Sequence, residues 1–308
     1  MKIESQLEKI SSFGSLELLA NQIVEGFISG MHKSPFHGFS SEFAEHKIYN
    51  AGESTKHIDW KLFAKTDRLY TKRYEEETNL RCHIIIDNSS SMHYPKLGSS
   101  QLFYENKIGF SVLATAVLMD LLKKQRDAVG LSVYSDTYEF YAPEKGSGRH
   151  HRMLLDKLEK VLDTPGTAKA TDTTTFLHQI AQKMHRRSMI ILFTDMFQPG
   201  NDEALFNALQ HLKHNKHKVV LFHVIDRKTE FNFDFDNTPR KFIDLETGEQ
   251  VNLFAENVKQ DYEKLVDDYF KKVADTCIQY RIKYVPVSVD EKFEKILTTY
   301  LVEKQKFG

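Results

Sequence analysis

Cysteine is scarce in this sequence, and so is net charge. Cys82 and Cys277 are the only cysteines in 308 residues, and they have no motif spacing. A disulfide framework is therefore not expected, and a reducing compartment is favoured. The formal net charge is −1, from 42 basic and 43 acidic residues. This balance gives no electrostatic case for binding nucleic acid or a membrane surface.

Long hydrophobic runs are also missing. No apolar run approaches the roughly 18 residues needed to span a bilayer. The first five residues include an acid and begin no signal-peptide apolar region. No Gly-x-Gly-x-x-Gly follows any predicted strand, so nucleotide binding has no support. We expect a cytoplasmic globular protein without a membrane span, long enough to bury a full core.

One stretch, residues 84–91, carries the chemistry. Its three isoleucines form a β-branched run without alternation, which predicts a strand buried on both faces. Asp87 ends that strand, and Ser89 and Ser91 follow at every second position. In an extended loop, alternate residues point the same way, so these three side chains can converge. Three hard oxygens suit Mg²⁺ or Mn²⁺ better than zinc, although Asp and Ser also simply make turns after strands.

This Asp-x-Ser-x-Ser resembles the first motif of the metal-ion-dependent adhesion site (MIDAS) of von Willebrand factor A domains. That family also needs a Thr in a later loop and an Asp that ends a hydrophobic strand. Residues 171–177, with three consecutive threonines, open a predicted helix, and residues 189–195 form a buried strand that ends in Asp195. The resemblance implies that Thr175, which lies just before the helical Leu177, and Asp195 complete the metal site. It also implies that the site binds a carboxylate of a partner protein through the metal.

Residues 80–225 alternate predicted strands and helices. Repeated β-α units of this kind predict a parallel sheet between two layers of helices. Residues 138–141 resemble the short antiparallel edge strand of the von Willebrand A fold. We therefore expect an α/β, von Willebrand A-like (Rossmann-like) three-layer sandwich. Ligand sites in such sheets lie at the carboxyl ends of the strands, where Asp87 and Asp195 are both expected.

Residues 1–79 are predicted to form an N-terminal helix and a small α+β extension, separate from a domain at 80–308. A polar segment at 226–253, with alternating phenylalanines at 231, 233 and 235, interrupts the second domain. We interpret it as an inserted hairpin, and exposed loop decoration is favoured over a partner-binding role.

The N-terminal block carries a second resemblance. Its pattern runs from Tyr49 through Gly52-Glu53, Ile58-Asp59-Trp60 and residues 63–72 to the Glu triplet at 75–77. This pattern resembles the bacterial domain-of-unknown-function 58 family, whose genes commonly lie beside those of MoxR-type AAA+ ATPases. The resemblance implies an adaptor or co-chaperone that works with such an ATPase.

An enzyme is the alternative. A Mg²⁺-dependent phosphatase of the haloacid dehalogenase type would use Asp87 as its nucleophile and a second Asp two positions later as acid and base. Here that position is Ser89, whose hydroxyl does not titrate in the useful range. Lys65 and Lys107 stay open as the lysine that such a site needs. We expect a metal-dependent binding module rather than a catalyst.

Overall fold

The computed structural model describes residues 16–31, 46–48, 60–72, 80–135, 138–163, 173–196, 202–214, 216–245 and 248–306. The chain forms two compact units. The larger unit comprises residues 1–27 and 80–308, and the smaller unit comprises residues 28–79. Within the described residues, no helix is long and apolar enough to cross a membrane.

The larger unit is built on one six-stranded sheet. Its strands are β3 (Arg81–Asp87), β4 (Ala128–Tyr134), β5 (Tyr138–Lys145), β6 (Met189–Thr194), β7 (Lys218–Ile225) and β10 (Lys283–Ser288). They lie in the order β10-β7-β6-β3-β4-β5, and every neighbouring pair is parallel except β4 and β5. The central strand β3 is buried from Cys82 to Asp87, as its continuous β-branched run predicts.

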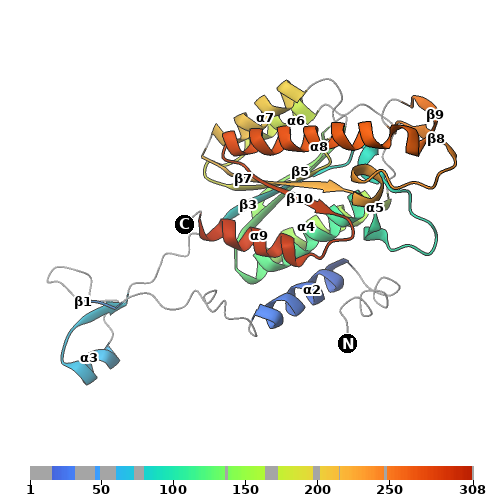
Figure 1. Ribbon diagram of the computed structural model, residues 1–308. Coiled ribbons are helices and arrows are strands. Elements are labelled where there is room, and N and C mark those ends of the chain that lie inside the picture. The colour runs from blue at the N-terminus through green and yellow to red at the C-terminus, as the bar shows by residue number, and fades with distance from the viewer. Residues whose placement is uncertain are drawn as a thin grey trace. The chain divides into compact units, whose positions relative to one another are not determined.

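Helices cover both faces of this sheet (Figure 1). One layer holds α4 (Lys107–Lys124), α5 (Gly148–Asp163) and α9 (Glu294–Gln305), and the other holds α6 (Thr173–Lys183), α7 (Asp202–His214) and α8 (Ala255–Gln279). This is the α/β three-layer fold that the sequence predicts, with β5 as its antiparallel edge. Short helices lie at η2 (Ser90–His93), η3 (Phe103–Glu105) and η4 (Arg227–Phe231).

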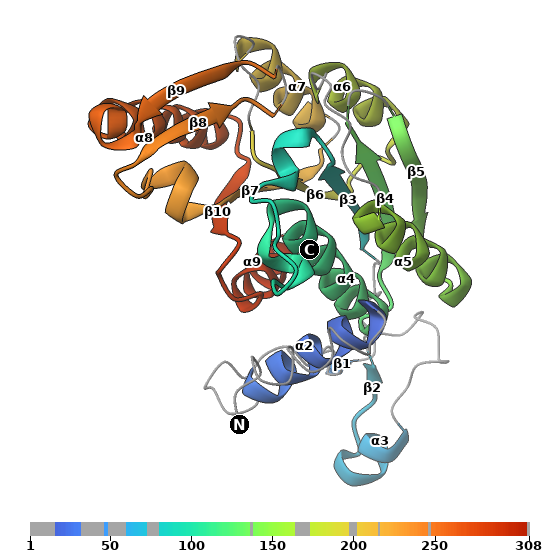
Figure 2. The ribbon, with the colours of Figure 1, turned by 90° about the vertical axis from the view of Figure 1, so that its right-hand side faces the viewer.

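Helix α2 (Leu16–Met31) groups with the sheet as far as Phe27, although the sequence places it in the N-terminal extension. Its buried side chains recur at three- and four-residue steps, and Glu17 forms an ion pair with Lys123 of α4. Burial of one apolar stripe thus accounts for its position beneath α4 (Figure 2).

The smaller unit pairs β1 (His46–Ile48) with β2 (Tyr70–Lys72) in antiparallel fashion and contains α3 (Trp60–Thr66). These elements give the smaller unit both helix and strand, in keeping with the α+β extension that the sequence predicts. Much of the N-terminal signature pattern, at 49–59 and 73–79, lies outside the described residues.

The segment 226–254 leaves the sheet and forms η4 and then the antiparallel hairpin of β8 (Pro239–Ile243) and β9 (Gln250–Phe254). Helix α8 begins directly after β9 at Ala255, and most of the polar residues of its first two turns face solvent.

Both edges of the sheet are irregular. On β10, Pro286 has no N–H, and its carbonyl accepts a hydrogen bond from Lys295 Nζ at 2.6 Å. On the other edge, the pairing of β5 with β4 shifts register twice. Such features make a strand a poor template for further pairing.

A polar chain crosses the sheet at β3, β4 and β5. His83 Nε2 lies 2.7 Å from Ser132 Oγ, and His83 Nδ1 lies 2.7 Å from Glu144 Oε1. The three residues have the order of a hydrolytic triad, but His83 and Ser132 are fully buried, so a substrate has no route to them. Their hydrogen bonds instead link three strands.

The close packing around His83 can be tested at Gly130. A Cβ added at this position would lie 2.5 Å from His83 Nδ1 and 2.9 Å from the Ala142 carbonyl oxygen. We expect Gly130→Ala to lower the free energy of unfolding by about 1–3 kcal/mol, the usual cost of overpacking. In Gly148→Ala the added Cβ meets no atom within 4 Å, so stability should stay equal or rise slightly. Chemical denaturation of both variants is the measurement, and equal stabilities would contradict the packing described.

Candidate functional site

The two strand-end aspartates meet where the strand order of the sheet reverses. Read in chain order, the strands lie as 3-2-1-4-5-6, and β3 and β6 are the adjacent parallel strands on either side of the reversal. Asp87 ends β3, and Asp195 directly follows β6. Sheets of this type bind ligands at this point, outside the carboxyl ends of the strands.

Asp87 is held rigidly and is only 3% exposed. One carboxylate oxygen accepts the backbone N–H of Ser89 at 2.9 Å, and the other accepts the Thr194 hydroxyl at 2.7 Å. Burial, followed by repulsion from Asp195, raises the pKa of Asp87 to about 6, although both hydrogen bonds act in the opposite direction. A neighbouring cation would relieve this repulsion.

Ser89 and Ser91 bring two hydroxyls together beside Asp87. Their Oγ atoms lie 3.1 Å apart, and both residues are buried. The loop is fixed at its start by a 2.7 Å hydrogen bond from the Asn88 N–H to the Tyr134 carbonyl, and η2 begins at Ser90. The Asp-x-Ser-x-Ser stretch therefore presents paired oxygens, as the alternation of its residues predicts.

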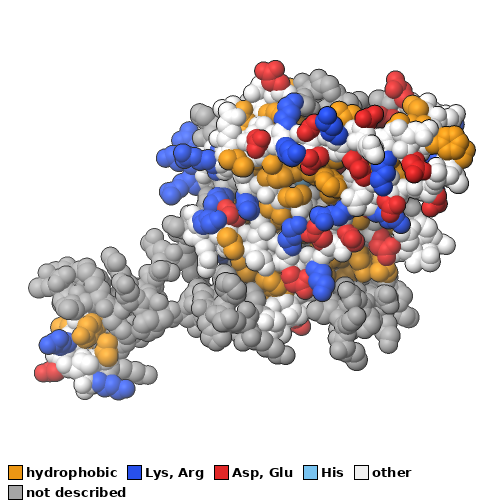
Figure 3. Space-filling view, in the orientation of Figure 1, with side chains coloured by type: hydrophobic (Ala, Val, Ile, Leu, Met, Phe, Trp, Pro, Cys, Tyr) orange, Lys and Arg blue, Asp and Glu red, His pale blue; other side chains and the backbone are white. Residues whose placement is uncertain are grey.

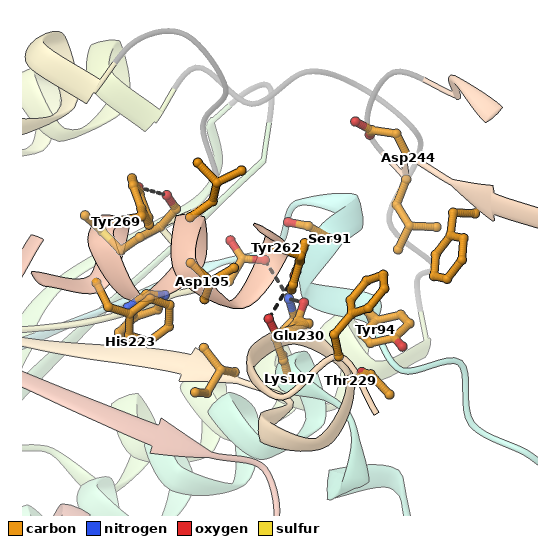
Figure 4. A pocket seen from close by; sticks show the side chains of 18 of the residues that line it. Ser91, Tyr94, Lys107, Asp195, His223, Thr229, Glu230, Asp244, Tyr262 and Tyr269 are labelled. Atoms are coloured by element: carbon orange, nitrogen blue, oxygen red, sulfur yellow. Dashed lines mark hydrogen bonds and ion pairs between the residues drawn. The ribbon is translucent and has the colours of Figure 1, made fainter. Parts of the chain in front are cut away.

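Lys107 supplies a cation that the sequence did not assign. It begins α4, is 1% exposed, and donates from Nζ to Asp195 Oδ2 at 2.8 Å and to Glu230 Oε1 of η4 (Figure 4). Burial alone would lower the pKa of Lys107, but the two carboxylates outweigh burial and raise it well above its usual value. The ammonium therefore joins β6, α4 and the inserted segment.

The charges at the site do not cancel. Three carboxylates, those of Asp87, Asp195 and Glu230, stand against the single ammonium of Lys107, which leaves two negative charges when all are ionised. Among the described residues, no three His, Cys, Asp or Glu side chains group as metal ligands, so a cation here would depend on the serine hydroxyls as well. Carboxylate and hydroxyl oxygens are the hard donors that Mg²⁺ and Mn²⁺ prefer, and the donor set fits such an ion.

Thr175, the predicted fifth donor, is exposed on α6, whereas the other four predicted donors are buried. Thr173 is buried and lies by the hydroxyl of Tyr134, which itself lies against Asp87. Between them, Thr174 Oγ1 is buried without a hydrogen-bond partner in the described part of the chain. A buried oxygen without a partner makes Thr174 a candidate for the fifth donor alongside Thr175.

Asp87, Ser89, Ser91 and Asp195 thus lie together at the strand ends, and their role as metal ligands stays a prediction. The sequence did not predict the ion pairs of Lys107 with Asp195 and Glu230. Lys107 had a usable signal, since it opens a helix whose residues are buried almost without interruption as far as Leu122. A charge at the head of such a helix has to be paired. Glu230 had no such signal in the sequence, because it lies 123 residues from Lys107, in the inserted segment.

The sheet order, the antiparallel edge strand and the two strand-end aspartates define a von Willebrand A-like domain. Within that class, the model of the family described as "Protein of unknown function DUF58" matches residues 45–271, and the chain belongs to this family.

Relatives and solved structures are similar at low identity. Uncharacterized proteins of Mycobacterium bovis and Mycobacterium tuberculosis are 21% identical over 212 residues, which are 69% of this chain and 63% of theirs. The match thus spans less than two thirds of these relatives.

Among solved structures, an aerotolerance-related membrane protein of Bacteroides fragilis is 14% identical, with a TM-score of 0.45 over 74% of this chain and 99% of that one. The VWA domain of SpRpn10 is 17% identical, with a TM-score of 0.37 over 71% and 94% of the two chains. The PilB minor pilin of Streptococcus sanguinis is 10% identical, with a TM-score of 0.43 over 78% and 64%.

The buried ion pair makes a quantitative prediction. Lys107→Met keeps most of the side-chain volume but leaves Asp195 and Glu230 without their ammonium, so we expect a loss of about 3–5 kcal/mol in the free energy of unfolding. Lys123→Met, on the same helix, removes a pair with Glu17 whose side chains are 46% and 51% exposed, and it should cost less than about 1 kcal/mol. Urea denaturation without divalent cations compares the two, and similar losses would show that the Lys107 pair does not stabilise the fold.

Proposed function

We propose that this protein is a metal-ion-dependent protein-binding module. Asp87, Ser89, Ser91 and Asp195, with a threonine of the α6 start, would hold Mg²⁺ or Mn²⁺, and the ion would offer an electrophilic position to an Asp or Glu of a partner protein. The observation that carries this proposal is the buried Asp87 carboxylate beside two hydroxyls 3.1 Å apart; among the described residues, no lysine forms an ion pair with it.

The surrounding residues favour binding over tight sequestration of the ion. Lys107 already neutralises part of the charge of Asp195, so few full carboxylate charges remain for the metal. A cation held mainly by neutral oxygens keeps its attraction for a further carboxylate, and Mg²⁺ keeps exchangeable water in such sites. The chain's own residues orient the ion and bury its inner side.

The partner machinery is proposed from the family resemblance. Genes of this family commonly lie beside those of MoxR-type AAA+ ATPases, which supports an adaptor or co-chaperone role for the protein in the cytoplasm. The low net charge supports a protein partner over nucleic acid.

The metal site is tested by calorimetry with Mg²⁺ and Mn²⁺. Asp87→Ala should abolish measurable binding while the far-ultraviolet circular dichroism stays unchanged, because Asp87 lies at the end of its strand. Asp290→Ala removes an exposed acid beyond the end of β10 and should bind as the parent does. Thr174→Val should weaken binding by roughly tenfold, about 1.4 kcal/mol, and Thr175→Val should not. Unchanged affinity in Asp87→Ala would refute the site.

A screen of phosphomonoesters with Mg²⁺ separates the binding module from a hydrolase. We expect no turnover that depends on Asp87, because general acid–base help is worth roughly 10²–10⁴ in rate and Ser89 cannot provide it. Lys107 also pairs with Asp195 and Glu230 instead of Asp87. Turnover that disappears in Asp87→Asn would establish the hydrolase.

A further inference from the structure

A cavity of about 630 Å³ opens beside the metal-site cluster. Ser91 and Asp195 belong to both, and with Lys107 and Glu230 they form the polar floor of the cavity (Figure 4). Ligand pockets in proteins commonly have volumes of roughly 300–1,000 Å³, with a few polar groups at one end of an apolar lining. The cavity and the cluster are therefore one continuous surface.

Aromatic side chains of the inserted segment and of α8 line the walls of the cavity. Phe233 stacks on Phe242 of β8, with ring centroids 5.4 Å apart, and its centroid lies 4.3 Å from that of Tyr262 on α8. Hydrogen bonds fix the wall, because the Tyr262 hydroxyl donates to the Glu230 carbonyl at 2.8 Å and the Tyr269 hydroxyl donates to the Met196 carbonyl at 2.5 Å. Phe233 is 8% exposed, so it is packed into the wall of the cavity, whereas the residues of strands β8 and β9 are exposed or half-buried.

Large apolar side chains at the mouth of this cavity are exposed to solvent. Leu265 of α8 is 70% exposed and Ile243 of β8 is 51% exposed, and both line the cavity. Figure 3 shows hydrophobic side chains gathered over this part of the molecule, by α8, β8 and β9. Exposed apolar surface next to a polar site is typical of places where a partner's apolar side chain docks.

We propose that the cavity receives a large aromatic or aliphatic side chain of a partner segment, while an adjacent Asp or Glu of that segment reaches the cation beside Asp87. This inference rests on the proposed metal-dependent function and names the partner's chemistry: an acidic residue next to a bulky apolar one.

Charge complementarity selects an acidic neighbour over a basic one. The Lys107 ammonium already lies between the two floor carboxylates, those of Asp195 and Glu230. The carboxylates of Asp87, Asp195 and Glu230 exceed this ammonium by two charges, which one divalent cation would neutralise. A carboxylate of the partner could then bind the cation, whereas an ammonium or guanidinium group offers it no oxygen.

The probes are blocked tetrapeptides of sequence Gly-Trp-Glu-Gly, with versions that carry Gln, Lys or Asp in place of Glu, titrated into the full chain by calorimetry. With Mg²⁺ we expect the Glu and Asp peptides to bind at least roughly tenfold more tightly than the Gln peptide, and the Lys peptide to bind most weakly. In EDTA, the preference for the Glu peptide over the Gln peptide should disappear.

Two variants of α8 test the apolar contact. Leu265→Glu should weaken binding of the uncharged Gln peptide at least roughly fivefold, since it places a charge at the mouth of the apolar cavity. Ile278→Glu, at a residue that is 72% exposed on the same helix and does not line the cavity, should leave that binding unchanged. Both variants should bind Mg²⁺ as the parent does, which shows that their folds are intact.

The outcomes separate the two proposals. If Mg²⁺ binds but Glu and Gln peptides bind equally, or if Leu265→Glu has no effect, the inference about the partner fails and the metal site stands. Preferential binding of the Lys peptide would overturn it as well. If the parent protein binds neither Mg²⁺ nor Mn²⁺, the proposed function itself fails, and this inference fails with it.

Discussion

The buried ammonium of Lys107 is the interaction on which the arrangement of the site depends. It is 1% exposed and holds together Asp195 after β6 and Glu230 in η4, while its own backbone begins α4. A lysine in such a place persists only when it is paired, and removal of either kind of partner leaves an uncompensated charge in the interior. The ion pairs of Lys107 with Asp195 and Glu230 therefore help to hold the inserted segment against the sheet.

This arrangement gives the carboxylate and hydroxyl cluster at the strand ends an additional wall. In the α/β sheet, Asp87 and Asp195 come together because adjacent parallel strands end at the same edge. The segment between β7 and α8 then places aromatic side chains next to that edge, and Glu230 ties the segment to the lysine. An ion at the edge would supply affinity for a carboxylate in general, whereas the aromatic wall would discriminate among the segments that carry one.

The parts of the fold that were predictable from sequence are those with local patterns. The run at 84–86 predicted a strand buried on both faces, and repeated β-α units predicted the three-layer sandwich, because both follow from the period of apolar residues. Which of the three consecutive threonines at 173–175 is buried was not predictable, since they differ only in which one the first turn of α6 turns inward. The Lys107–Glu230 pair and the cavity were also beyond prediction, because they depend on contacts between distant segments and not on any period.

Pro286 and the bulged pairing of β5 determine what kind of recognition this domain can use. Many binding domains capture an extended peptide by adding it to an open sheet edge, where main-chain hydrogen bonds provide affinity with little regard for sequence. Here the β10 edge lacks an N–H at Pro286, whose carbonyl is already bonded to Lys295, and the opposite edge is out of register twice. β-Augmentation is therefore unfavourable at either side of this sheet, which agrees with the proposal that a partner is bound through side chains at the carboxyl ends of the strands.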